Sequence, residues 1–301
     1  MKTMTGAVCL ISLFCLSAVA QTEDRLTSDK NTQATAEVAK SLSQIATEMN
    51  AVCSQGRIQD VFDLFRLMKE FGVTYQPTLT APHHLTGLLN PEQLRMYAGV
   101  KLFDALYAAT FMQRQDVADC VATIEQIQDS LELRSYADIN NYFLHTLKNA
   151  ASRPEEVDVQ ALIAQLSSDY VQELPELLSS NESAEYLIES LYGFFVELNY
   201  VRYSLMATPA REQMEIGFSQ INTTDIYQLL LNAFEAFNRM DETIRVEGEV
   251  EEKLAVMRAV HHLAESENNQ TMTDEFANPL WALLGNRIVG IRTSILTPPE
   301  E

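Results

Sequence analysis

The sequence predicts an all-α protein, a helical bundle of about ten helices, and three observations support this. Apolar residues recur at spacings of three and four over most of the chain, as they do along one face of a helix. Runs that alternate apolar and polar residues, which are typical of strands, are few. The chain of 301 residues is 47% apolar and has only 10 Gly and 9 Pro, so it can bury a sizeable core.

The chain divides into a leader, a polar lead-in, a helical domain and a tail. Residues 1–20 are the predicted leader, and residues 21–33 form a polar and flexible lead-in. The helical domain covers residues 34–296, and it could consist of two packed halves, 34–152 and 157–296. The proline-containing tail at 297–301 ends the last helix.

The leader matches a secretory signal peptide. Lys2 precedes an apolar run from Ala7 to Leu16, and the small residues Ala18 and Ala20 stand at positions −3 and −1 before Gln21. This run is too short to cross a bilayer, and no later segment has the roughly 18 consecutive apolar residues of a transmembrane helix. We expect an exported protein, periplasmic or extracellular, with no transmembrane segment in its mature form.

Two cysteines, Cys53 and Cys120, remain after the leader is removed. An oxidising compartment favours a disulfide between them, which would contribute roughly 4 kcal/mol by restricting the unfolded chain. The alternative is a pair of buried thiols at apolar helix positions, because Cys120 stands beside Val117 and Val121.

Acidic residues outnumber basic ones by 42 to 21, which gives a net charge of −21. A nucleic-acid partner is excluded on this ground, because binding phosphates requires Lys and Arg. The same charge disfavours an anionic membrane surface.

The helical period continues through most of the chain after the lead-in. Asn90 and Pro91 predict the N-cap and first residue of a helix that runs to about Met112. Other helices are predicted at 38–52, 58–71, 117–131, 135–150, 157–179, 183–206, 246–265 and 274–295, with two more beginning at Pro209 and Asp225. The longest stretch without this period, 73–89, contains two prolines and the pair His83–His84, and a loop of this length is often functional.

Two segments, 94–112 and 186–206, are apolar on nearly every face, which predicts central helices. Each carries an acid that would be costly to bury, Asp104 in the first and Glu189 in the second. Asp104 shares a face with Tyr107, and Glu189 with Tyr192, because each pair is three residues apart. If the two helices pack together, these four side chains could form one buried polar cluster.

Such a cluster has more than one interpretation. It could be a structural network in which each carboxylate is hydrogen-bonded, since a bare buried carboxylate is costly. It could instead form a ligand pocket, or hold two carboxylates with shifted pKa values for acid–base chemistry. Arg202, on the second helix, could neutralise one of the acids.

Two short motifs resemble those of a group of uncharacterised, all-helical secreted proteins and lipoproteins of bacteria. The first is the helix pattern Gly99, Asp104, Tyr107 with Ala108, Thr110 and Phe111 following. The second is the stretch LIESLY at 187–192, which resembles an aromatic-Ile-Glu-Gly-Leu-Tyr run of that group.

This chain departs from the second motif at two positions. Leu187 replaces the aromatic residue and Ser190 replaces the glycine, whose small size could allow close helix contact. The resemblance covers about 190 residues loosely. It implies a helical fold and a bacterial exported protein, and it implies no activity.

Motifs for other chemistries are missing. There is no HExxH, G-x-S-x-G, Walker A, G-x-G-x-x-G or C-x-x-C-H sequence, so no cofactor, metal or catalytic residue is predicted. His261 and Glu265, four apart on one helix, could contact a metal, as could the adjacent His83 and His84. The acidic run at 247–252 suits the N-terminus of a helix.

Three hypotheses about function follow. The first is an exported, non-enzymatic protein that binds a protein partner or a small apolar ligand. The second is a small-ligand-binding protein with a pocket between helices 94–112 and 186–206, formed by Asp104, Tyr107, Glu189 and Tyr192. The third is a metal-dependent or hydrolytic enzyme that uses His83, His84 or His261. A pocket between the two helices would favour the second, and converging metal ligands the third.

Overall fold

The computed structural model describes Lys69 and residues 72–133, 181–206, 227–228, 231–232, 249–267 and 279–299. Within these ranges 79% of residues are helical and none forms a strand, which confirms the all-α prediction for this part. The predicted leader, the lead-in, Cys53 and the helices expected at 38–52, 135–150 and 157–179 lie outside the described residues.

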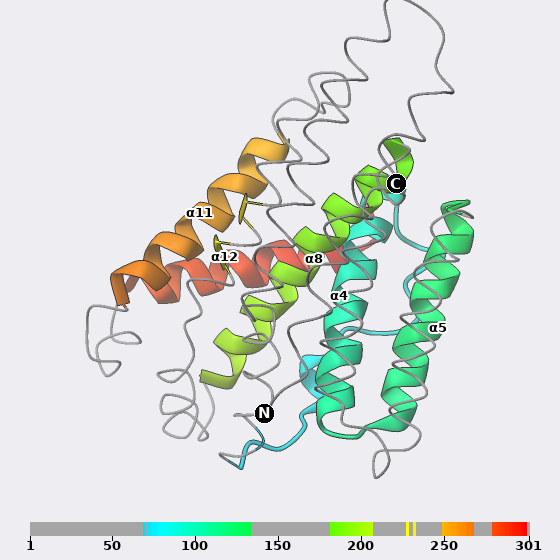
Figure 1. Cartoon of the computed structure of the whole chain (residues 1–301), viewed down its shortest axis with the longest axis horizontal. Helices are drawn as coiled ribbons and strands as arrows, with labels where there is room; N and C mark the ends of the chain where they lie inside the picture. Colours follow the sequence, from blue (N-terminus) through cyan, green and yellow to red (C-terminus); the bar gives the residue numbers. More distant parts are fainter. Residues whose placement is uncertain are drawn as a thin grey trace, which may run out of the picture.

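The described residues form five α-helices, of which α4 is central. They are α4 (Pro91–Thr110), α5 (Arg114–Ser130), α8 (Asn181–Met206), α11 (Glu249–Glu267) and α12 (Pro279–Leu296), with a 3-10 turn η2 at Pro77–Leu79. Helix α4 packs against α5, α8 and α12, while α11 crosses α12 at an angle (Figure 1). The two segments predicted to be central are therefore α4 and its main partner α8.

Helix α4 starts where the sequence predicts and ends two residues earlier. Asn90 accepts a hydrogen bond from the backbone N–H of Gln93 (2.9 Å), and the Gln93 side chain accepts one from the N–H of Asn90 (3.2 Å). At the other end, Met112 adopts a left-handed φ of 58°, and the N–H of Gln113 donates to the carbonyl of Ala108 at 2.9 Å. These features form a helix-ending turn, so the predicted end at Met112 is corrected to Thr110.

Helix α5 covers Arg114–Ser130, where the sequence predicts 117–131. Its last turn closes in the same way, because Glu132 has a φ of 56° and the N–H of Leu133 donates to the carbonyl of Gln128 at 3.0 Å. Helices α11 and α12 agree with the segments predicted at 246–265 and 274–295 within a few residues.

The contact between α4 and α8 depends on two glycines. A Cβ atom built on Gly99 would lie 1.8 Å from the carbonyl oxygen of Ser190, and one on Gly193 would lie 1.9 Å from that of Met96. The two backbones therefore touch, and the Ser190 hydroxyl donates to the carbonyl of Arg95 at 3.1 Å. No ligand can lie between the helices at this crossing.

Helix α12 is fixed to both central helices. The amide of Gln93 donates to the carbonyls of Ser294 (2.7 Å) and Thr297 (2.8 Å), so one side chain caps the start of α4 and the end of α12. Gly285 leaves room for the ring of Tyr203 on α8. A Cβ atom built on Gly285 would lie 2.2 Å from the nearest atom of that ring. Because the start of α12 contacts the end of α8, α12 runs antiparallel to α8.

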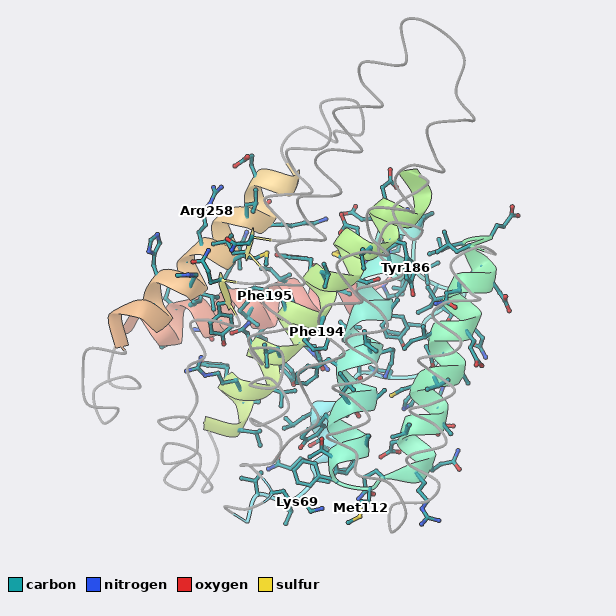
Figure 2. The ribbon with its side chains drawn as sticks, in the orientation of Figure 1. Lys69, Met112, Tyr186, Phe194, Phe195 and Arg258 are labelled. Carbon is teal, nitrogen blue, oxygen red and sulfur yellow. The ribbon has the colours of Figure 1, made fainter. Side chains whose placement is uncertain are left out.

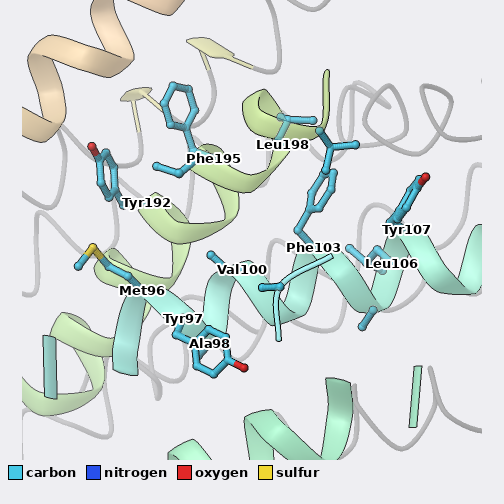
Figure 3. Close-up of a cluster of buried hydrophobic side chains, with 14 of the residues drawn as sticks. Met96, Tyr97, Ala98, Val100, Phe103, Leu106, Tyr107, Tyr192, Phe195 and Leu198 are labelled. Atoms are coloured by element: carbon cyan, nitrogen blue, oxygen red, sulfur yellow. The ribbon is translucent and has the colours of Figure 1, made fainter. Parts of the chain in front are cut away.

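The core consists of the inner faces of these helices. Phe194 and Phe195 project from α8 (Figure 2), and the ring of Phe194 meets Phe103 of α4 edge-on at 5.4 Å between centroids. Figure 3 shows Met96, Val100 and Phe103 along α4 with Tyr192, Phe195 and Leu198 along α8. All six side chains are buried. No helix in the described part of the chain has the length and apolar character to cross a membrane.

Replacing Gly99 by Ala is expected to lower the free energy of unfolding by about 3 kcal/mol, because a methyl group would collide with the α8 backbone. Urea denaturation measures the change. The control is Gly290→Ala on the exposed side of α12, where nothing lies within 4 Å of the new methyl group. That substitution should raise the stability by about 0.5–1 kcal/mol through helix propensity. Equal effects at the two positions would contradict the close crossing.

Candidate functional site

A fully buried ion pair lies on the face of α4 that points away from solvent. Lys101 and Asp104 are both 0% exposed, and their Nζ and Oδ2 atoms are 3.0 Å apart. Their separation of three residues places both on one helix face. Oδ2 also accepts a hydrogen bond from the backbone N–H of Ala81 at 2.9 Å, and Lys101 donates to the carbonyl of the same residue.

A second ion pair, between a buried glutamate and a half-buried arginine, joins α8 to α12 beside the first. Arg292 donates from Nε to one oxygen of Glu197 (2.6 Å) and from its terminal nitrogen to the other (2.8 Å). This two-bond geometry is the strongest form of an ion pair. The guanidinium also lies 3.8 Å from the ring centroid of Tyr200 and donates to the carbonyl of Leu79 at 3.1 Å. We call Lys101, Asp104, Glu197 and Arg292 the charge cluster.

The two carboxyl groups of the charge cluster influence each other. Burial and the nearby charge of Asp104 raise the pKa of Glu197 to about 8, and Arg292 only partly opposes this. Burial also raises the pKa of Asp104, against the opposing effect of Lys101 and the Ala81 N–H. The other oxygen of Asp104, Oδ1, is buried and has no hydrogen-bond partner among the described residues. The cluster therefore holds its protons more tightly than exposed carboxyl groups do.

A segment of the predicted loop lies across this cluster. We call residues 76–82 the strap. Side chains of α4 and α12 bind its backbone at five points. Two N–H groups donate, that of Gln76 to the Tyr107 hydroxyl (3.2 Å) and that of Ala81 to Asp104. Three carbonyls accept, that of Leu79 from Arg292, that of Ala81 from Lys101 and that of Pro82 from the Tyr97 hydroxyl. The loop at 73–89 is non-helical as predicted, apart from the short turn η2.

Glu189 belongs to a different cluster. Lys253 of α11 donates to Glu189 (2.6 Å) and to Glu92 of α4 (2.9 Å), and its ammonium group lies 5.6 Å from the centroid of the Tyr192 ring. Burial raises the pKa of Glu189, and Lys253 partly opposes this. Burial alone would lower the pKa of Lys253, but the two glutamates outweigh it and raise that pKa. This cluster fixes α11 against the central pair.

The four residues singled out from the sequence are therefore not brought together. Asp104 and Tyr107 contact the strap, whereas Glu189 and Tyr192 contact α11 through Lys253. Tyr107 and Tyr192 lie at opposite ends of the view in Figure 3. Helices α4 and α8 do pack as expected, but Glu197, not Glu189, is the acid next to Asp104.

Tyr107 and Tyr192 also take part in separate aromatic groups. Tyr107 lies 5.1 Å from Tyr75 and 5.2 Å from Phe111, between ring centroids. Tyr192 stacks on Phe195 at 6.3 Å. Both tyrosines therefore contribute packing area in addition to their hydroxyl groups.

The sequence interpretation did not single out Lys101, Glu197 or Arg292. Lys101 and Glu197 are charged residues inside segments that are otherwise apolar, which is the same signal that marked Asp104 and Glu189. Arg292 had no comparable signal, because the position that faces Glu197 depends on how α12 crosses α8. Arg202, predicted as a neutralising cation, donates to the hydroxyl of Tyr227 at 2.9 Å.

The remaining candidate residues have these positions. Cys120 is buried, and burial raises the pKa of its thiol. Because Cys53 lies outside the described residues, the disulfide remains a prediction. Burial and Lys101 lower the pKa of His83, and its ring lies 6.5 Å from that of His84. His261 bonds to Gln228. Within the described ranges, no three His, Cys, Asp or Glu side chains converge as metal ligands.

No known family model, curated protein or solved structure matches this chain.

Replacing Lys101 by Met is expected to lower the free energy of unfolding by about 3–5 kcal/mol, because Asp104 would remain buried without its cation. The double variant Lys101→Met, Asp104→Leu should be more stable than the sum of the single effects predicts. Chemical denaturation of the four proteins measures this coupling. As a control, Arg287→Met removes an exposed partner of Glu252 and should cost less than about 1 kcal/mol. Additive effects at 101 and 104 would contradict the ion pair.

The raised pKa of Glu197 predicts how stability depends on pH. A pKa of about 8 in the folded protein lies above the ordinary value of 4.5, so the folded state binds the proton more tightly. This contribution to stability is complete below about pH 4.5 and is lost as the pH rises through about 8, by at most about 1.4 kcal/mol per pH unit. As the pH rises over this range, the free energy of unfolding of wild type should fall relative to that of Glu197→Gln, which does not titrate. A constant difference between about pH 5 and about pH 9 would show that Glu197 does not titrate there.

Proposed function

We propose that the protein is an exported, non-enzymatic helical protein that binds a polypeptide partner or a small apolar ligand. Its helical domain would cover residues 34–296 in a bundle of about ten helices, of which the five described here form one part. The bacterial secreted group that the motifs of α4 and α8 resemble fits this assignment.

One observation carries the proposal: each acid buried in the two central helices is paired with a cation of the same chain. Asp104 pairs with Lys101, Glu197 with Arg292, and Glu189 with Lys253. A catalytic carboxyl group has to reach its substrate, whereas Asp104 and Glu197 are 0% exposed. These pairings support a role in packing for the acids that had suggested acid–base chemistry.

The geometry gives less support to a ligand pocket between α4 and α8. The backbones touch at Gly99 and Gly193, and the four residues proposed for that pocket divide between two clusters. A partner would therefore bind elsewhere, on a surface that these helices hold in place.

Export is supported by the pattern of the first twenty residues. The apolar run and the small residues Ala18 and Ala20 fit recognition and cleavage by a secretory signal peptidase. The excess of acids keeps the chain soluble and away from anionic surfaces.

When the full chain is produced in an exporting bacterium, we expect the released protein to begin at Gln21, as measured by intact mass and N-terminal sequencing. A matched variant, Ala18→Tyr with Ala20→Tyr, should keep its leader because bulky residues block the cleavage site. Uncleaved wild-type protein that stays in the cytoplasm would contradict export.

Native mass spectrometry of the same material tests the binding role. A complex with a polypeptide or an apolar small molecule is the expected result. A stoichiometric metal ion would contradict the proposal and favour a metalloprotein.

A further inference from the structure

The strap differs from an ordinary surface loop in how its backbone is held. Its main-chain N–H and carbonyl groups at Gln76, Leu79, Ala81 and Pro82 are bound by helix side chains. Within the strap itself, the backbone makes only the hydrogen bonds of η2, from Leu79 to Gln76 (3.1 Å) and from Thr80 to Pro77 (3.3 Å). The strap thus lies on the helices as a bound peptide lies on a receptor.

The side chains beneath the strap form an ordered row. Tyr97, Lys101, Asp104 and Tyr107 follow each other along α4 at spacings of four, three and three, which places them on one face. Arg292 extends the row from α12. These five side chains contact main-chain groups, which every peptide has, so the row does not require the sequence of the strap.

Two small apolar anchors complete the contact. Leu79 is 7% exposed and Ala81 is 2% exposed, whereas Pro77, Thr78 and Pro82 face solvent. A suitable ligand is therefore a peptide that can form the short turn of the strap, with an apolar residue two positions before a small one. The net charge of −21 disfavours an acidic peptide.

Opening the strap would expose two small parts of the core, Leu79 and Ala81, together with the charges beneath it. The strap covers Lys101, Asp104, Glu197 and Arg292, and water would solvate these charges once the strap moves away. Glycines lie near both ends of the loop: Gly72 has a φ of +80°, and Gly87 has nothing within 4 Å of its Cβ position. Such positions can absorb the backbone rotation that a lid requires.

We propose that residues 76–82 act as a lid that occupies, in the free protein, a binding site for a non-acidic peptide of a partner. The partner's main chain would replace the strap on Tyr97, Lys101, Asp104, Tyr107 and Arg292. This inference rests on the proposed binding function and names the class of ligand and the site.

The first test is hydrogen exchange of the strap in the full chain. The variant Tyr97→Phe with Tyr107→Phe removes two contacts with the strap and keeps both rings in the core. Losing one such hydrogen bond raises the equilibrium constant for strap opening about fivefold. The amides of Gln76, Leu79, Thr80 and Ala81 should therefore exchange at least about tenfold faster than in wild type. The amides in the middle of α4 should be unchanged.

A matched control is Tyr192→Phe, which removes a buried hydroxyl group from the neighbourhood of Lys253, away from the strap. It should leave strap exchange unchanged. If the strap amides of the double variant do not exchange faster, or if they accelerate only together with those of α4, the strap does not open as a unit and the proposal is wrong.

The second test is binding of a fluorescent peptide with the sequence of residues 74–84, followed by anisotropy. The variant Leu79→Ala, which shortens a buried anchor of the strap and keeps all five contacting side chains, should bind it about tenfold more tightly than wild type, because its site is less often closed. A peptide that is N-methylated at the position of Ala81 lacks the N–H that Asp104 accepts, and should bind the variant at least about tenfold more weakly. Equal binding of both peptides, or no binding to a variant whose strap opens, would overturn the proposal.

These tests are separable from those of the proposed function. A chain that is exported and carries a partner but does not bind the peptide contradicts only the lid. A chain that is not exported but exchanges its strap for the peptide contradicts only the proposed export.

Discussion

The backbone contact between α4 and α8 is the constraint on which the rest of the structure depends. Gly99 and Gly193 allow each helix to touch a carbonyl of the other, which leaves little freedom in the position or direction of either helix. That fixed crossing decides which side chains of α8 face α4, and it places Glu197 beside Asp104. Ser190 fits the crossing because its hydroxyl donates to the backbone carbonyl of Arg95.

The charge cluster joins elements that are far apart in the chain. Two helices supply the acids Asp104 and Glu197, and Arg292 comes from near the C-terminus of the chain. Buried ion pairs add little net stability, because the loss of hydration offsets most of their attraction, yet removing one partner is costly. Such pairs favour one arrangement of α4, α8, α12 and the strap over its alternatives. This is the physical basis for assigning the buried acids to structure and for regarding the strap above them as the movable part.

The strap and the helices have different kinds of stability. The helices are held by apolar burial, as with Phe103 and Phe195, which are 1% and 0% exposed. The strap is held mainly by polar contacts, which water can replace when they open. A protein with one rigid part and one exchangeable segment is suited to binding, since binding segments come from the least stable part of a fold. The apolar anchors Leu79 and Ala81 give the strap its position by joining the hydrophobic core at its edge.

The sequence by itself determined the local features. The spacing of apolar residues identified α4, α5, α8, α11 and α12, and the cap at Asn90 fixed the start of α4, because these depend on neighbouring residues. It also marked Asp104 and Glu189 as acids that would need partners. Only the tertiary structure decided which partners they have: Lys101 and the strap for one, Lys253 of α11 for the other. Periodicity places a residue on a face but does not specify which helix covers that face, and that choice depends on a glycine crossing between residues about ninety positions apart.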